Sequence, residues 1–194
     1  TSSVPNEGKT TCSLSLARAA AKSGQKVLII DCDLRRPSLH KALQVPNSQG
    51  IVDYLSRQKE LEDVIEIDFK SEAHYILAGP SLSNATDVLA SNLMSELLEA
   101  LSDTYDLVVL DTPPVLAVSD QLVLGRQVDK TIFVIEWHRT RRGEAAAALK
   151  KIIASGADVA GVVLSKVDIK KFERYYGSGS GHYAGQYGNH YSEA

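Results

Sequence analysis

The fold of this chain is decided by the stretch Ser3-Val4-Pro5-Asn6-Glu7-Gly8-Lys9-Thr10. It matches the phosphate-binding loop pattern G-x-x-x-x-G-K-[ST] at every defined position except the first, where Ser3 replaces glycine. Gly8 lets the backbone approach a phosphate closely, Lys9 adds a positive charge, and the Thr10 hydroxyl can bind Mg²⁺ at a helix start that already favours anions. The sequence therefore predicts a nucleotide-binding loop formed by Pro5, Asn6, Glu7, Gly8, Lys9, Thr10 and Thr11.

The residues after the loop alternate between helical and strand patterns. Thr10–Ser23 has helical spacing closed by Gly24, and Lys26–Asp31 is an apolar run typical of a parallel strand buried on both faces. We expect further strands near residues 74–78, 106–111, 131–136 and 160–164, a helix over 87–101, and an irregular helical stretch over 37–72. The pattern predicts one doubly wound α/β domain, with a mostly parallel sheet and helices on both faces. Because a phosphate-binding loop follows a β-strand, we also expect the first strand to lie upstream of Thr1, outside this chain.

Three aspartates are expected at the carboxyl ends of the predicted strands. Asp31 ends the first apolar run, Asp33 follows two residues later, and Asp111 ends the run Leu107–Asp111. Ligands of open α/β sheets bind at this edge, so we expect all three carboxylates near the loop. Asp111 has the placement of a Walker B aspartate, which holds Mg²⁺ directly or through water. Any one of the three can be a helix cap or a surface ion pair, but together they indicate a metal-bound phosphoryl group beside a proton acceptor.

Five of the eight tyrosines lie in the last twenty residues, spaced by glycine and serine. Residues 175–194 have almost no aliphatic side chains, so burial cannot offset the entropy of ordering them. We expect residues 1–170 to form the folded domain and residues 171–194 a flexible tail. The tail alone fits a low-complexity linker equally well, but with a nucleotide site in the same chain it predicts phosphoacceptors at Tyr175, Tyr176, Tyr183, Tyr187 and Tyr191.

The order of these motifs resembles the catalytic domain of the bacterial tyrosine kinases of capsule and exopolysaccharide synthesis. The resemblance covers nearly the whole chain and is carried by the loop, by Val27–Pro37, by Asp106–Pro114 and by the tyrosine cluster. Further matching stretches are 50–55, 77–84, 115–120 and 161–168. The resemblance implies an ATP-dependent protein tyrosine kinase that uses Mg²⁺ and phosphorylates its own C-terminal tyrosines, between neighbouring subunits.

The resemblance also implies roles for individual residues. The catalytic residues would be Lys9, Asp31, Asp33 and Asp111, and the metal ligands Thr10, Asp33 and Asp111. Asp31 would accept or orient the proton of the attacking tyrosine, although Asp31 and Asp33 can exchange these roles. Ser165 departs from the family, which often places an asparagine there, near the adenine.

The resemblance extends to partners and location. It implies a ring-like homo-oligomer of neighbouring subunits, a membrane-embedded polysaccharide co-polymerase or activator domain, and a protein tyrosine phosphatase. It implies a cytoplasmic domain, associated with the inner face of the membrane through segments outside this chain.

A second class of function stays open. Partitioning, septum-placement (MinD-like) and nitrogenase-iron-protein ATPases are related by fold and place a signature lysine one residue after the first loop glycine. Val4 stands there in this chain, which favours the kinase over a nucleotide-driven switch or scaffold whose tail is an interaction segment.

Composition narrows the remaining options. A net charge of −3 argues against a nucleic-acid binder, and no apolar run approaches the ~18 residues of a membrane span. Cys12 and Cys32 lack metal-site spacing and fit a reduced cytoplasmic setting as small buried hydrophobes. The histidine pair of the tail makes too weak a case for a metal site. The run Arg139, Arg141 and Arg142 predicts a solvated helix start, with contact to an activator, a neighbouring subunit or the phosphorylated tail as the alternative.

Overall fold

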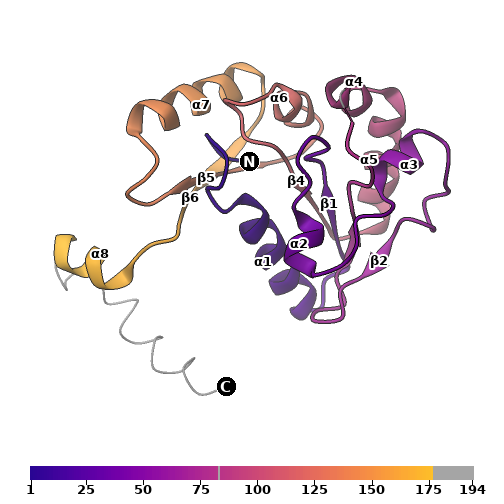
Figure 1. The fold of residues 1–194 in the computed structure, drawn as a ribbon, viewed down its shortest axis with the longest axis horizontal. Coiled ribbons are helices and arrows are strands. Elements are labelled where there is room, and N and C mark those ends of the chain that lie inside the picture. The colour runs from indigo at the N-terminus through magenta and orange to yellow at the C-terminus, as the bar shows by residue number, and fades with distance from the viewer. Residues whose placement is uncertain (83, 177–194) are drawn as a thin grey trace.

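A four-stranded, mostly parallel sheet and a two-stranded parallel sheet form the centre of the protein in a computed structural model that describes residues 1–82 and 84–176 (Figure 1). One sheet has the order β2-β3-β1-β4, in which β1 runs parallel to β3 and β4 and β2 is antiparallel at the edge; β5 and β6 form a second, parallel pair. The strands are β1 (Val27–Asp31), β2 (Glu66–Ile67), β3 (His74–Ile76), β4 (Leu107–Asp111), β5 (Thr131–Glu136) and β6 (Val159–Ser165). The predicted α/β fold with a mostly parallel sheet is confirmed.

Helices cover both faces of the larger sheet. The helices of the described residues are α1 (Lys9–Lys22), α2 (Leu39–Leu43), α3 (Ile51–Leu55), α4 (Ala85–Leu89), α5 (Asn92–Thr104), α6 (Asp120–Leu124), α7 (Arg142–Ala154) and α8 (Ile169–Tyr176). Of these, α1 and α5 pack on opposite faces of β1 and β4, whereas α7 packs on β5. Within the described residues no helix has the length and hydrophobicity needed to cross a bilayer.

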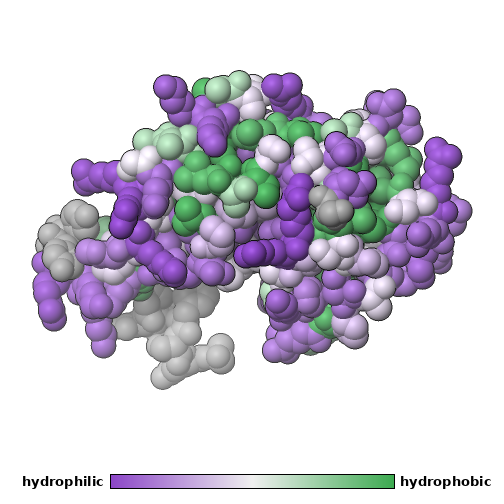
Figure 2. All heavy atoms as spheres, turned by 45° about the horizontal axis from the view of Figure 1, so that its top comes forward, coloured by the Kyte–Doolittle hydropathy of each residue, from purple (hydrophilic) through white to green (hydrophobic). Residues whose placement is uncertain are grey.

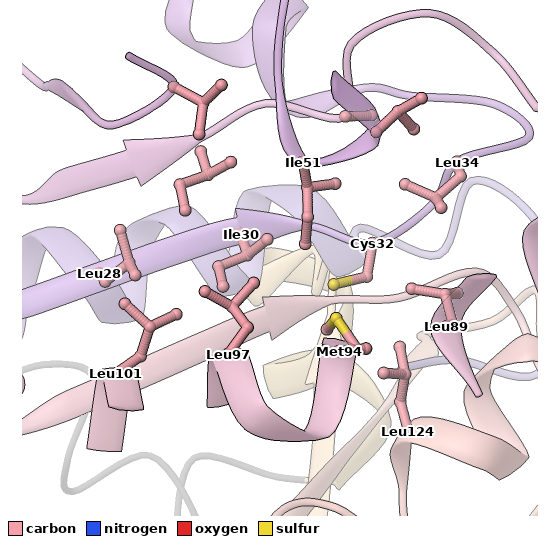
Figure 3. Close-up of a cluster of buried hydrophobic side chains, with 14 of the residues drawn as sticks. Leu28, Ile30, Cys32, Leu34, Ile51, Leu89, Met94, Leu97, Leu101 and Leu124 are labelled. Carbon is pink, nitrogen blue, oxygen red and sulfur yellow. The ribbon is translucent and has the colours of Figure 1, made fainter. Parts of the chain in front are cut away.

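The continuous apolar run of β1 is explained by burial on both faces. Leu28 and Ile30 belong to the core cluster on the α5 side, where Met94 and Leu97 point toward them (Figure 3). The alternate residues of β1 pack in a second cluster against α1. Full burial of each such side chain contributes roughly 1.5–3 kcal/mol, so β1 fixes the layer order of the domain.

Two local predictions need correction. The helix expected over 87–101 is two helices, because Ser91 starts α5 afresh by accepting the Met94 N–H at 3.2 Å. The stretch 37–72 contains α2 and α3 but also β2, which is too short, at 2 residues, to show an alternating pattern in the sequence. Across the boundary expected between domain and tail, residues Ile169–Tyr176 form α8, and at its start the Asp168 carboxylate accepts the Lys171 N–H at 3.1 Å.

The start of the chain runs between the two sheets. Ser2 forms a parallel bridge with Val134 of β5, and its carbonyl accepts the Val115 N–H at 2.9 Å. The Thr1 amino group donates to the Ile132 carbonyl at 3.0 Å. These residues therefore occupy the position between β4 and β5 that is expected for the strand leading into the loop.

Apolar side chains gather on the face that carries α4, α6 and α7 (Figure 2). A groove of about 710 Å³ lies there, and its lining includes the apolar residues Ala90, Leu122, Val123 and Ala154 and the basic residues Arg126 and Lys151.

Candidate active site

The loop before α1 has the backbone that its glycine predicts. Gly8 adopts φ +88°, the left-handed region that side chains rarely enter, and a Cβ there would lie 3.5 Å from that of Ser165. Lys9 then starts a helix of 14 residues, whose first N–H groups favour an anion. Pro5, Asn6 and Thr11 are exposed, whereas Gly8, Lys9 and Thr10 are half-buried. The loop therefore presents an accessible anion site at the start of α1.

Glu7 differs from the rest of the loop because its side chain is buried, with 1% exposure. Its carboxylate accepts the Val4 N–H at 2.8 Å and a short hydrogen bond from the Thr140 hydroxyl. The Ser165 hydroxyl donates to the Glu7 carbonyl at 2.5 Å, and the Lys166 ammonium donates to the Asn6 carbonyl. Glu7 therefore shapes the loop through its side chain. Ser165, at the end of β6, contacts the loop backbone.

The three predicted aspartates meet at one edge of the sheet. Asp31 and Asp111 are direct neighbours in the register of β1 and β4. Asp31 is fully buried, and Asp33 and Asp111 are 8% and 2% exposed. Asp111 accepts the Thr10 hydroxyl at 2.6 Å and the Ser13 hydroxyl at 3.3 Å, which ties β4 to the loop.

The loop after β1 folds around the Asp31 carboxylate. Its carboxylate accepts backbone N–H groups of Asp33 at 3.1 Å, Ser38 at 3.0 Å and Leu39 at 2.9 Å. Asp33 in turn accepts the Arg36 N–H at 3.0 Å. The segment after β1 is therefore folded back on its own carboxylates, which places Ser38 beside the phosphate-binding loop.

Burial governs the charge of this cluster. Burial and the negative charge of Asp111 raise the pKa of Asp31 to about 7, against the opposing backbone hydrogen bonds. Burial also raises the pKa of Asp111 and of Asp33, and the charge of Lys9 counteracts both shifts. Three carboxylates facing one lysine favour an added cation.

The residues present fit Mg²⁺. Among the described residues, no three His, Cys, Asp or Glu side chains converge closely enough to hold a metal by themselves. Mg²⁺ commonly takes one or two carboxylates together with phosphate oxygens and waters, so this donor set, with its Thr10 hydroxyl, suits a magnesium nucleotide.

Sequence reasoning missed the contacts that hold the site together. The Arg35 guanidinium donates two hydrogen bonds to the buried Asp120 carboxylate, at 2.8 and 3.2 Å, and one to the Thr86 hydroxyl at 3.0 Å. The Ser38 hydroxyl lies 2.7 Å from that of Thr10. Arg35 and Asp120 lie in the matching stretches Val27–Pro37 and 115–120, but nothing in those stretches indicates that the two residues pair, and no motif marks Ser38.

The other predicted residues divide into two groups. Arg139, Arg141 and Arg142 are exposed at the start of α7, which confirms a solvated helix start. Cys12 and Cys32 are free thiols, and Cys32 is fully buried. Of the predicted phosphoacceptors, two lie on α8, beyond the domain boundary expected at residue 170: Tyr175 and Tyr176. The other three lie outside the described residues: Tyr183, Tyr187 and Tyr191.

Comparison with known protein sequences identifies relatives of this chain. The family profile of an AAA domain matches residues 6–156. Tyrosine-protein kinase YwqD of Bacillus subtilis is 33% identical over 175 residues, which cover 90% of this chain and 74% of the relative. Tyrosine-protein kinase etk of Escherichia coli K12 is 38% identical over 176 residues, which cover 91% of this chain but only 24% of the relative. The chain thus spans about a quarter of the length of its E. coli relative.

Solved structures agree with the sequence relatives. The kinase domain of VpsO superposes with a TM-score of 0.82 at 39% identity, covering 87% of this chain and 83% of that one. MinD of Pyrococcus horikoshii with Mg-ADP gives a TM-score of 0.69 at 20% identity, covering 84% of this chain and 68% of that one, and shows a shared fold alone. The chain therefore belongs to the family of bacterial tyrosine-protein kinases and carries their kinase domain.

Proposed function

We propose that this domain transfers the γ-phosphoryl group of ATP to tyrosines of its own C-terminal tail, and that this autophosphorylation regulates polymerisation and export of exopolysaccharide or capsule. The observation that carries the proposal is the position of Asp31. It is a fully buried carboxylate, in register with Asp111 and next to the phosphate-binding loop, with a pKa raised to about 7. A general base works best when its pKa lies near the operating pH, and a nucleotide hydrolase that only switches shape needs no base for tyrosine.

Each group then has a role that follows from its chemistry. The first N–H groups of α1 and the Lys9 ammonium bind the phosphates and stabilise the charge of the transferring group. Bound Mg²⁺ supplies neutralisation of the phosphate charge, and Thr10, Asp33 and Asp111 would hold it. The Asp31 carboxylate accepts the proton from the tyrosine hydroxyl, while that oxygen forms the bond to phosphorus and the bond to the leaving ADP oxygen breaks.

The tail supplies the acceptors in this proposal. Its five tyrosines follow α8 or end it, and a segment without apolar anchors can reach the active site of a neighbouring subunit. Each phosphate adds about −1.5 to −2 charge, so the modified tail is repelled by the aspartates of the site. Phosphorylation is thereby coupled to release of the tail.

The proposed partners follow from the relatives and from one surface. The apolar groove between α6 and α7 supports contact with neighbouring subunits in a homo-oligomer. Relatives include the putative tyrosine-protein kinase EpsB of Ralstonia solanacearum and one from the cps region of Klebsiella pneumoniae. We place this domain on the cytoplasmic side of the membrane, beside a membrane-embedded polysaccharide co-polymerase and opposed by a protein tyrosine phosphatase.

Incubation with Mg²⁺ and ATP, followed by intact-mass measurement, tests the proposal. A kinase adds steps of ~80 Da to itself, whereas a MinD-like switch releases phosphate to water and keeps its mass. Lys9→Met should abolish the steps, because loss of a group that stabilises the transition state costs about 10²–10³ in rate. Lys22→Met, an exposed lysine at the end of the same helix, is the matched control and should leave them unchanged. Phosphate release without added mass would contradict the kinase proposal.

A further inference from the structure

Ser38 places a second hydroxyl beside that of Thr10. The two hydroxyl oxygens are 2.7 Å apart, and the Thr10 oxygen is also 2.6 Å from an Asp111 carboxylate oxygen. Thr10 has one hydroxyl proton, which it gives to the carboxylate. The Ser38 hydroxyl must therefore donate to Thr10, and it occupies a lone pair of the oxygen that the metal needs.

This hydroxyl has no role in the local fold. Ser38 precedes α2, but its side chain makes no capping hydrogen bond to that helix. The loop is held instead by the backbone N–H of Ser38, which donates to Asp31 at 3.0 Å. Within the described part of the chain, the hydrogen bond to Thr10 is the one that the Ser38 hydroxyl makes.

The spacing suits two neighbouring ligands of one small cation. Adjacent oxygens of an octahedral site with metal–oxygen distances of ~2.1 Å are separated by roughly 3.0 Å, so the two hydroxyl oxygens, 2.7 Å apart, need to separate only slightly to bind one ion. Mg²⁺ takes oxygen ligands, and a neutral hydroxyl at this spacing is chemically suited to the ion beside carboxylates, phosphate oxygens and waters. We propose that Ser38 Oγ binds Mg²⁺ beside Thr10 Oγ1, so that the protein supplies two hydroxyl ligands. This inference rests on the proposed function, since the ion arrives with the nucleotide.

A consequence is a direct link between the metal and the proposed base. The same residue would bind the ion through its hydroxyl and hold Asp31 through its N–H. When Ser38 turns its hydroxyl proton away from Thr10 to bind the ion, the backbone that orients Asp31 is fixed as well. The metal would therefore order the loop that orients the base, Asp31 at the end of β1.

Calorimetric titration with ADP, with and without Mg²⁺, measures the gain in affinity that the metal gives. Ser38→Ala should reduce that gain at least about 10-fold, the lower range for loss of a group that supports a metal site, and leave binding without metal unchanged. Ser38→Thr keeps the hydroxyl and should keep the gain. Ser81→Ala is the matched control, because the Ser81 hydroxyl contacts the carbonyls of Leu34 and Arg35 in the same loop and not Thr10.

Ser38→Cys gives a spectroscopic test that does not depend on activity. A thiolate prefers a soft cation, so this variant bound to ADP should show an ultraviolet Cd²⁺–thiolate band that the wild type, with the same two native cysteines, lacks. If Thr10→Ala removes the metal gain while Ser38→Ala keeps it and Ser38→Cys shows no band, the proposal is overturned and the proposed function stands. If the wild type itself gains nothing from Mg²⁺, both fall. A circular dichroism spectrum of Ser38→Ala that matches the wild type excludes misfolding. If Ser38→Ala does not fold, the Cd²⁺–thiolate band of Ser38→Cys tests the proposal instead.

Discussion

Replacing Asp31 by asparagine should change the stability of the nucleotide-free domain in opposite directions at low and high pH. The pKa of Asp31 is about 7 in the folded protein, because of burial and the nearby Asp111, against an ordinary value of 3.8. An acid whose pKa is raised by folding stabilises the protein fully at low pH, and this contribution is lost as the pH rises through the folded value. The wild type should therefore be less stable at pH 8 than at pH 5.

The size of the effect follows from the proton released. About two pH units of this interval lie below the folded pKa, and each is equivalent to roughly 1.4 kcal/mol, so the free energy of unfolding should fall by roughly 3 kcal/mol. Asp31→Asn carries no charge. It should lose about 1 kcal/mol at pH 5, because an amide nitrogen replaces one oxygen that accepts a backbone N–H. At pH 8 it should be more stable than the wild type by roughly 2 kcal/mol.

Urea unfolding followed by far-ultraviolet circular dichroism, with chelator and without nucleotide, measures both proteins across this range. Asp103→Asn, on the exposed surface of α5, controls for the loss of one negative charge. A difference between wild type and Asp31→Asn that stays constant from pH 5 to pH 8 would refute the reasoning. In that case Asp31 is ionised throughout and is a poor proton acceptor at neutral pH.

Two further outcomes are expected. Arg35→Lys should lower the free energy of unfolding by about 1–3 kcal/mol in denaturant titrations, because a lysine cannot donate two parallel hydrogen bonds to the fully buried Asp120 carboxylate. An unchanged free energy of unfolding would mean that the Arg35–Asp120 pair does not stabilise the fold. Replacing the tail tyrosines together by phenylalanine should abolish the added mass and preserve ADP affinity, and phosphorylation that peptide mass spectrometry finds at Tyr54, Tyr75 or Tyr105 in this variant would contradict the acceptor role. The replaced residues are Tyr175, Tyr176, Tyr183, Tyr187 and Tyr191.

The sequence was most informative where structure is local. The apolar run of β1 has to be buried on both faces, and a strand that ends in aspartate has to place it at the carboxyl edge, so Asp31 and Asp111 were predicted together. The boundary between α4 and α5 was missed because Ser91 marks it without glycine or proline. Here a single cap overrides an otherwise continuous helical pattern.

Contacts between distant loops were beyond prediction from one sequence. Thr140 reaches Glu7 across 133 residues, and Arg35 reaches Asp120 across 85. These residue types are common on protein surfaces, so their presence alone predicts no contact. Which loops meet depends on the order of the strands: β1 lies beside β4, and the start of the chain pairs with β5. The contacts that hold the active site in place therefore follow from the topology of the sheet, whereas its reactive groups can be recognised from sequence motifs.

The loop pattern defines glycine at two positions, 3 and 8, but the backbone requires glycine only at position 8. Gly8 has φ +88° and lies against Ser165, so a side chain there would be strained. Ser3 is not among the residues with positive φ, and its carbonyl accepts the Leu116 N–H at 3.1 Å. A Cβ is therefore compatible with the backbone at position 3. Replacement of the first glycine leaves the anion-binding part of the loop intact, because that part is shaped by Gly8 and by the start of α1.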